Sequence, residues 1–152
     1  MSKIIKARDK IEDGFLVFLS GSVAGADWRA ALMKNLEDEN IVFLDPRRDD
    51  YASMKMTIND QKFHDQVTWE QDGLEKANVI VMHFNRNSDA PISLLEFGLF
   101  ARSERMVVRC PQGYKHKGYV DVLCARFGVE QVDTLEEITL SILERYSKHK
   151  KE

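Results

Sequence analysis

The sequence has few of the residues that staple small or secreted folds. Its two cysteines, Cys110 and Cys124, show neither CxxC spacing nor a nearby histidine. We therefore interpret them as reduced, packed thiols. No apolar run approaches the roughly 18 residues that a membrane span needs, and the first residues lack the apolar stretch of a signal peptide. We expect a soluble, cytoplasmic protein with no membrane partner.

Neither sign of charge dominates. With 22 Lys and Arg against 25 Asp and Glu, the formal net charge is −3, which gives no electrostatic reason to expect nucleic acid as a partner. Neither GxGxxG nor GxxxxGK[ST] occurs, which argues against a dinucleotide-binding Rossmann domain and excludes a P-loop. The histidines lack ligand spacing, and His83 is interpreted as a core residue. We expect no metal and no cofactor.

The hydrophobic pattern predicts one α/β domain over residues 1–152, with an ordered core from about residue 14 to about residue 147. Apolar runs bounded by turn residues predict strands at 15–20, 41–45 and 79–84, with weaker candidates at 106–110 and 129–132. Helical periodicity predicts helices at 28–36, 60–76, 92–102, 119–127 and from 134 onward. The lysine-rich end, 147–152, is expected to fray.

Strands that are apolar throughout and alternate with helices are typical of a parallel sheet covered on both faces. We predict a flavodoxin-like or Rossmann-like three-layer sandwich with a five-stranded parallel sheet in the order 2-1-3-4-5. The reversal then lies between the first and third strands, and a ligand crevice is expected beyond their carboxyl ends. The polar segment 46–59 is predicted to be a long surface loop.

Unusual residues follow those two strands. Ser20-Gly21-Ser22 forms a short turn whose backbone can approach a ligand closely. The segment after the third strand leads into an apolar helix in which Glu96 has no Lys or Arg three or four residues away. Either Glu96 forms a capping box with Ser93, or it faces a cavity. The two are compatible, because a helix N-terminus also keeps a carboxylate ionised.

A second carboxylate is also out of place. Glu70 falls on the apolar stripe of Phe63, Val67 and Leu74. Burying an unpaired carboxylate is costly, so Glu70 needs a partner or a function. Two interpretations remain open: a buried pair with Arg29, Arg47 or Arg48, or a carboxylate that faces the same cleft as Glu96.

Four segments together form a fairly specific pattern. They are FLSGS at 18–22, DPRR at 45–48, Trp69-Glu70 followed by Leu74 and the run ANVI at 77–80, and PISLLEFG at 91–98. In order and spacing the chain resembles the nucleoside 2-deoxyribosyltransferase-like proteins. The resemblance implies the same parallel sandwich, Glu96 as the nucleophile and Glu70 as a base-contacting acid. The residues expected to contact substrate are Phe18, Ser20, Gly21, Ser22, Asp45, Arg48, Trp69 and Ser93.

The chain departs from that family at three positions. Family members often have an aspartate six residues before the nucleophile, where this chain has Ala90; Asp89 lies seven before, so Asp89 or Glu70 is the candidate proton donor. Phe18 stands where many members have a tyrosine. Ala24 stands where the related deoxynucleoside 5′-monophosphate hydrolases have an arginine, a charge that Arg47, Arg48 or Arg86 could supply.

These residues suit N-glycosidic bond chemistry. A carboxylate can stabilise an oxocarbenium-like state and trap it as a glycosyl ester, while a second acid protonates the leaving base. We expect transfer of 2-deoxyribose between nucleobases, with hydrolysis or non-catalytic nucleotide binding as alternatives. The expected partners are a nucleoside or nucleotide and a free nucleobase, and the resemblance implies a homo-oligomer with subunit contacts near the cleft.

Overall fold

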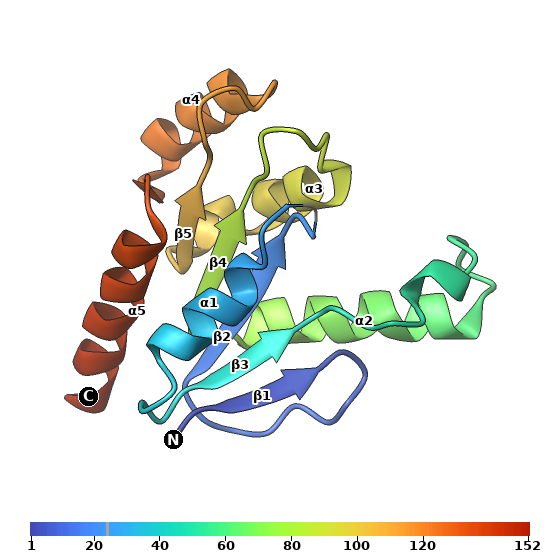
Figure 1. Cartoon of the computed structure of the whole chain (residues 1–152), viewed down its shortest axis with the longest axis horizontal. Helices are drawn as coiled ribbons and strands as arrows, with labels where there is room; N and C mark the ends of the chain where they lie inside the picture. The colour runs from blue at the N-terminus through green and yellow to red at the C-terminus, as the bar shows by residue number, and fades with distance from the viewer. Residues whose placement is uncertain (24) are drawn as a thin grey trace.

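A six-stranded parallel sheet forms the centre of the computed structural model, which describes residues 1–23 and 25–152 (Figure 1). The strands are β1 (Lys3–Lys6), β2 (Leu16–Gly21), β3 (Val42–Asp45), β4 (Val79–His83), β5 (Met106–Arg109) and β6 (Glu130–Val132). Their order is β1-β3-β2-β4-β5-β6, and every pair is parallel. The chain order therefore reverses between β2 and β4.

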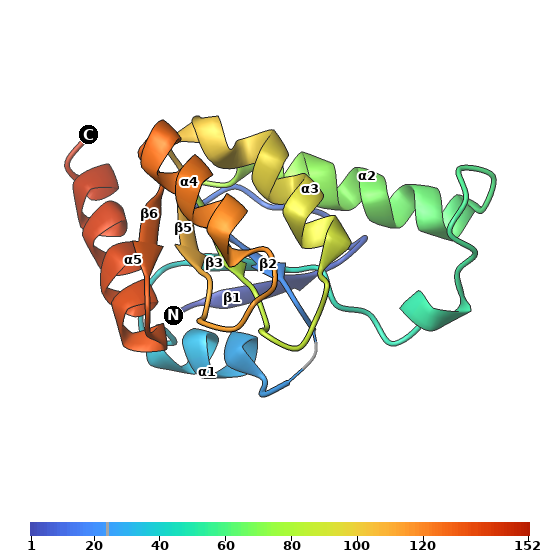
Figure 2. The ribbon, with the colours of Figure 1, turned by 90° about the horizontal axis from the view of Figure 1, so that it is seen from above.

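Helices cover both faces of the sheet. They are α1 (Trp28–Asn35), α2 (Gln61–Lys76), α3 (Pro91–Phe100), α4 (Lys117–Phe127) and α5 (Leu135–Lys150), with single 3-10 turns η1 (Tyr51–Ser53) and η2 (Ala101–Ser103). Figure 2 shows α2, α3 and α4 on one side of the sheet and α1 on the other, beside α5. None of the helices in the described part of the chain is both long and apolar enough to cross a membrane.

Successive side chains of a central strand pack into two different core clusters, one on each face of the sheet. In β2, Phe18 packs with Trp69 in the cluster under α2, α3 and α4, whereas Val17 and Leu19 belong to the cluster under α1 and α5. Because both faces are buried, the strands need apolar residues at every position, which is the pattern that predicted them. Cys110 and Cys124 are free and buried, as interpreted from the sequence.

The predicted three-layer fold is confirmed, and the five predicted strands take the order 2-1-3-4-5. The strand count was wrong, because β1 adds a sixth strand beside β3 at the sheet edge. Its sequence, KIIK, is mostly solvent-facing and gave no apolar run. The prediction that residues 147–152 fray was also wrong for 147–150, because α5 continues to Lys150. Lys148 and Lys150 lie in its last turn, where their positive charges complement the helix dipole.

The segment 46–59 is a long loop, as predicted, with η1 as its one regular turn. It is tied to the turn after β1. Arg8 donates to both carboxylate oxygens of Asp50 at 2.8 Å, and Arg48 donates to the Ala7 carbonyl at 2.7 Å and to Asp9 at 2.6 Å. The additional strand β1 thus leads into a turn that anchors the loop beside the cavity.

Candidate active site

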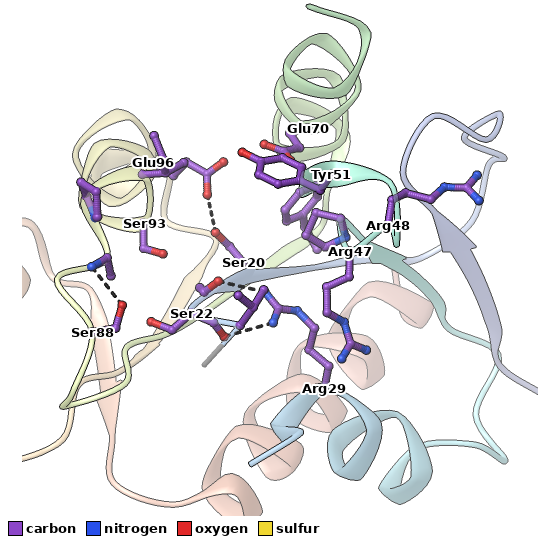
Figure 3. A pocket seen from close by; sticks show the side chains of 17 residues that line it. Ser20, Ser22, Arg29, Arg47, Arg48, Tyr51, Glu70, Ser88, Ser93 and Glu96 are labelled. Atoms are coloured by element: carbon purple, nitrogen blue, oxygen red, sulfur yellow. Dashed lines mark hydrogen bonds between the residues drawn. The ribbon is translucent and has the colours of Figure 1, made fainter. Parts of the chain in front are cut away.

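A cavity of about 470 Å³ opens beyond the carboxyl ends of β2 and β3, beside the crossover from β4 to α3 (Figure 3). This volume is within the roughly 300–1,000 Å³ typical of small-molecule sites. The wall consists of the end of β2, one residue of α1, the loop after β3 with η1, one residue of α2, and the first turns of α3 with the residues before them. The lining residues are Phe18, Ser20, Gly21, Ser22, Val23, Arg29, Pro46, Arg47, Arg48, Tyr51, Glu70, Ser88, Ala90, Pro91, Ile92, Ser93 and Glu96.

Glu96 projects from the second turn of α3 into this cavity. Its exposed fraction is 6%, and the Ser20 hydroxyl donates to its Oε1 at 2.7 Å. Among the described residues no cation lies within ion-pair distance, and no donor reaches Oε2. Burial raises the pKa of Glu96, while the Ser20 hydrogen bond and the charge of Arg29 oppose that rise. One carboxylate oxygen is therefore held and the other is left for a ligand.

Of the two interpretations of Glu96, the capping box with Ser93 does not form. The helix begins at Pro91, directly after Ala90, whose φ of 47° lies in the left-handed region. Ser93 is thus already inside the helix, and Glu96 lies in its second turn. Proline is well suited to the first helical position, because the missing N–H needs no partner there. The α3 N-terminus therefore presents Ser93 and Ile92 to the cavity without a side-chain cap.

Glu70 reaches the same cavity from α2 and is half-buried. The amide of Gln66 donates to its Oε2 at 2.8 Å. Burial raises the pKa of Glu70 to about 7. The hydrogen bond from Gln66 opposes this rise, and the negative charge of Glu96 adds to it. The alternative of a buried arginine pair is not what the structure contains: within the described chain, no ion pair joins Glu70 to an arginine.

Arg29 instead fixes the end of β2. Its guanidinium donates to the carbonyls of Leu19, Gly21 and Ser22 at 3.1, 3.0 and 3.1 Å, and its exposed fraction is 2%. Burial lowers the pKa of Arg29 to about 10, so it remains charged at neutral pH. A buried cation at the cavity wall helps to keep a nearby carboxylate ionised.

Gly21 is required by the close approach of two strand ends. Its φ is +126°, and a Cβ there would lie 2.1 Å from the His83 carbonyl oxygen. The next residue, Ser22, donates its N–H to that same oxygen at 2.9 Å. Gly21 and Ser22 both line the cavity. Ala24, which follows in this turn, lies outside the described residues.

Asp45 lies behind the wall and not on it. Burial alone would raise its pKa, but hydrogen bonds from Arg47 and Lys6 outweigh that effect and hold the pKa at about 2. Arg47 donates to both Asp45 oxygens, at 3.1 and 2.9 Å, and Lys6 donates at 2.9 Å. The ionised Asp45 thereby positions Arg47, which lines the cavity together with Arg48.

Two other predicted residues are also away from the wall. Trp69 donates to the Asp9 carbonyl at 2.8 Å and packs its ring 5.9 Å from that of Phe18, which does line the cavity. Asp89 is exposed and pairs with Lys115 at 2.7 Å. The hydrogen bond and charge of Lys115 lower the pKa of Asp89, which is the wrong direction for an acid that must carry a proton.

Sequence reasoning missed Tyr51 as a lining residue. Its side chain lies in the cavity between Glu70 and Glu96 in the view of Figure 3. Nothing in the local pattern distinguishes it from any other loop tyrosine. Within residues 1–23 and 25–152, no group of three or more His, Cys, Asp or Glu side chains is placed to hold a metal ion.

A parallel α/β sandwich with a ligand cavity at its switch point, and two glutamates in that cavity, defines a class of small-molecule-binding α/β proteins. The model of the nucleoside 2-deoxyribosyltransferase-like family matches residues 14–114, which include every residue of the cavity wall. The chain belongs to this family. No curated protein sequence matches it significantly.

Proposed function

We propose that this protein acts on the N-glycosidic bond of (deoxy)nucleosides and transfers 2-deoxyribose between nucleobases through an ester on Glu96. The observation that carries the proposal is the environment of Glu96. One oxygen is fixed by Ser20 and the other is unpartnered among the described residues, in a cavity that also contains a carboxylate with a raised pKa. Such a pair separates the roles of nucleophile and acid.

In the first step the free oxygen of Glu96 attacks C1′ of the sugar. The bond between C1′ and the base nitrogen breaks, and its electron pair leaves with the base. Protonated Glu70 gives its proton to the departing base, so no free anion forms. The sugar is then held as an ester on Glu96, with inverted configuration at C1′.

In the second step a nitrogen of another base attacks C1′ from the side that the first base left. The ester bond to Glu96 breaks, the carboxylate is regenerated and Glu70 recovers a proton from the attacking base. Two inversions give net retention. When water attacks in place of a base, the same residues make the enzyme a hydrolase, so exclusion of water decides the outcome.

We assign the proton to Glu70 and not to Asp89. Glu70 lines the cavity, and its pKa of about 7 leaves it largely protonated at mildly acidic pH and about half protonated at pH 7. Asp89 is exposed and bound to Lys115. Phe18 and Tyr51 supply flat apolar surface that suits a base. The guanidinium groups of Arg47 and Arg48 are already held by acidic side chains, Arg47 by Asp45 and Asp27 and Arg48 by Asp9.

We further propose that a second copy of the chain covers the outer face of α3. Ile92, Leu95 and Leu99 are 48%, 61% and 59% exposed on this face, and Ile92 also borders the cavity. Apolar residues grouped in this way are typical of an interface. Closure of the rim by a neighbour would exclude water and favour transfer over hydrolysis. The free, buried thiols suit a reducing, cytoplasmic setting.

The proposal is tested by mass spectrometry of products. The protein is mixed with a panel of deoxynucleosides and their monophosphates together with a labelled free base. Labelled nucleoside indicates transfer, and unlabelled base with free sugar indicates hydrolysis. Glu96→Ala should lose both activities yet remain folded and still bind ligand, while Glu75→Gln, an exposed site on α2, serves as the matched control. Full activity in Glu96→Ala would reject the nucleophile assignment.

A further inference from the structure

A fully buried amide lies beside Glu70. Gln66 is on α2, one helical turn before Glu70, and its exposed fraction is 0%. Its Nε2 donates to the Pro46 carbonyl at 2.8 Å and to Oε2 of Glu70 at 2.8 Å. Its Oε1 is buried and has no hydrogen-bond partner within the described chain. Buried polar atoms are normally paired, so the two contacts of the nitrogen are what hold this amide in place.

The Pro46 carbonyl fixes which end of the Gln66 amide faces Glu70. Its oxygen can only accept, and among the described residues no other donor reaches it. Turning the amide over would place Oε1 of Gln66 against this oxygen, and two acceptors would then face each other at hydrogen-bond distance. Nε2 of Gln66 therefore faces both Pro46 and Glu70, whether or not Glu70 carries a proton.

A donor held against one oxygen decides where a neutral carboxyl group carries its proton. The two oxygens of an ionised carboxylate are both acceptors, but in the neutral acid one is a C=O oxygen and the other bears the hydrogen. An N–H pairs better with the C=O oxygen than with the hydroxyl oxygen. Because Nε2 of Gln66 is held against Oε2 of Glu70, the hydrogen of the acid belongs on Oε1. In the described part of the chain nothing donates to or accepts from Oε1.

We propose that Gln66 is a positioning residue that keeps Oε2 of Glu70 an acceptor and leaves the proton of the acid on Oε1, where a base in the cavity can take it. This inference deepens the proposed function and rests on it, because that function needs Glu70 to present a hydrogen to the leaving base. Glu70 lies at the cavity wall, as Figure 3 shows, whereas Gln66 is not part of the wall. Gln66 thus acts through Glu70 and does not touch the substrate.

The same hydrogen bond sets how readily Glu70 gives up its proton. Burial raises the pKa of Glu70, and the hydrogen bond from Gln66 opposes that rise, so that the pKa is about 7. An N–H donor stabilises the ionised carboxylate more than the neutral acid. Without Gln66, Glu70 would keep its proton to higher pH and would be a weaker acid.

The direct test is an NMR titration of ligand-free wild-type protein that follows the two Nε2 protons of Gln66. Both protons should exchange slowly with solvent at pH 5 and at pH 8.5, because each is hydrogen-bonded in both states of Glu70. The proton that faces Glu70 should also shift with the same midpoint as the Glu70 carboxyl carbon, and in Glu70→Gln this midpoint should vanish. Fast exchange of that proton at pH 5, or a signal that does not follow Glu70, overturns the proposal.

Gln66→Met is the informative variant, because methionine has a similar size and no donor. The pKa of Glu70 should rise by about one pH unit, the scale expected for a hydrogen bond to a charged group. Gln71→Met, at a half-buried position of the same helix, is the matched control and should leave the pKa within about 0.2 pH units. A pKa that falls or stays in place in Gln66→Met contradicts the role of Gln66. The wild-type titration decides the question even where Gln66→Met does not fold.

Kinetics separate this inference from the proposed function. In Gln66→Met the alkaline limb of the kcat profile should move up by about one pH unit. Below that limb kcat should fall about threefold, since a weaker acid donates its proton more slowly, and KM should stay within about twofold. Lower activity with an unshifted limb would mean that Gln66 only supports the fold, which contradicts the proposal. Wild-type protein without turnover on the nucleoside panel contradicts the proposed function instead, and the titration still decides where the proton of Glu70 lies.

Discussion

Replacing Glu70 by Gln should make the folded protein more stable at alkaline pH and leave it nearly unchanged at acidic pH. In the folded state burial raises the pKa of Glu70 from its ordinary value of 4.5 to about 7. A group with a raised folded pKa contributes its full stability below pH 4.5 and loses it as the pH rises through 7. Above that pH the protein must hold an ionised carboxylate near Glu96, which glutamine avoids.

The size of the effect follows from the pKa values. A difference of about 2.5 between folded and unfolded pKa corresponds to roughly 3 kcal/mol, at about 1.36 kcal/mol per pKa unit. Because Glu70 is half-buried and its neighbours can relax, we expect about 1–3 kcal/mol. Glutamine retains an oxygen that accepts the hydrogen bond from Gln66, so the packing cost is small.

The assay is urea unfolding of wild type, Glu70→Gln and Glu75→Gln at pH 5, 7 and 8.5. The stability difference between Glu70→Gln and wild type should grow with pH and level off above pH 8. Glu75 is exposed on the same helix, and its variant should stay within about 0.5 kcal/mol of wild type throughout. A Glu70→Gln difference that is equal at pH 5 and pH 8.5 would refute the reasoning that burial holds the proton on Glu70.

Two further substitutions test the wall around Glu96. Ser20→Ala removes the hydroxyl that donates to Glu96 at 2.7 Å. The pKa of Glu96 should rise, and the rate should fall roughly tenfold to a hundredfold, the range for a hydrogen bond to a charged group. A pH–rate profile measures both effects, and a profile identical to that of wild type would contradict this role of Ser20. Gly21→Ala places a Cβ 2.1 Å from the His83 carbonyl oxygen at a φ of +126°. Thermal unfolding should therefore show that the free energy of unfolding falls by about 2 kcal/mol or more. A wild-type melting temperature would mean that β2 and β4 can separate at that point without cost.

The sheet could be predicted because its strands are buried on both faces. Residues 15–20 and 79–84 are apolar at every position, and that pattern reports burial directly. β1 could not be predicted in the same way. At the sheet edge only Ile5 is buried, so Lys3 and Lys6 flank the strand at no cost, and the sequence KIIK carries no periodic signal.

The carboxylates of the site could be found because each is chemically out of place. Glu96 stands alone in an apolar helix, so its burial could be inferred from its neighbours in sequence. The stripe predicted around Glu70 was a poorer guide, because Val67 is exposed and the buried residues of α2 are Gln66, Trp69, Gly73 and Leu74. The partners of the two carboxylates could not be inferred. Ser20 contacts Glu96 across 76 positions of the chain, a contact that exists only once β2 and α3 are packed together.

Arg29 and Tyr51 are two residues of the cavity wall that the sequence does not identify. Arg29 finds its three carbonyl partners where β2 ends, because the turn into α1 brings the guanidinium back over the strand. Tyr51 reaches the cavity because Arg8 and Asp50 anchor its loop. Neither residue is unusual among its sequence neighbours, so only the assembled fold identifies them.

The central claim is that Glu96 forms a bond with the sugar. The most direct measurement is peptide mapping by mass spectrometry after the protein is mixed with a deoxynucleoside in the absence of an acceptor base and quenched within milliseconds. We predict a deoxyribosyl adduct on the peptide that contains Glu96, absent in Glu96→Gln and discharged when a free base is added before the quench. Turnover that proceeds with no adduct on that peptide, or with the adduct on another residue, would contradict the account.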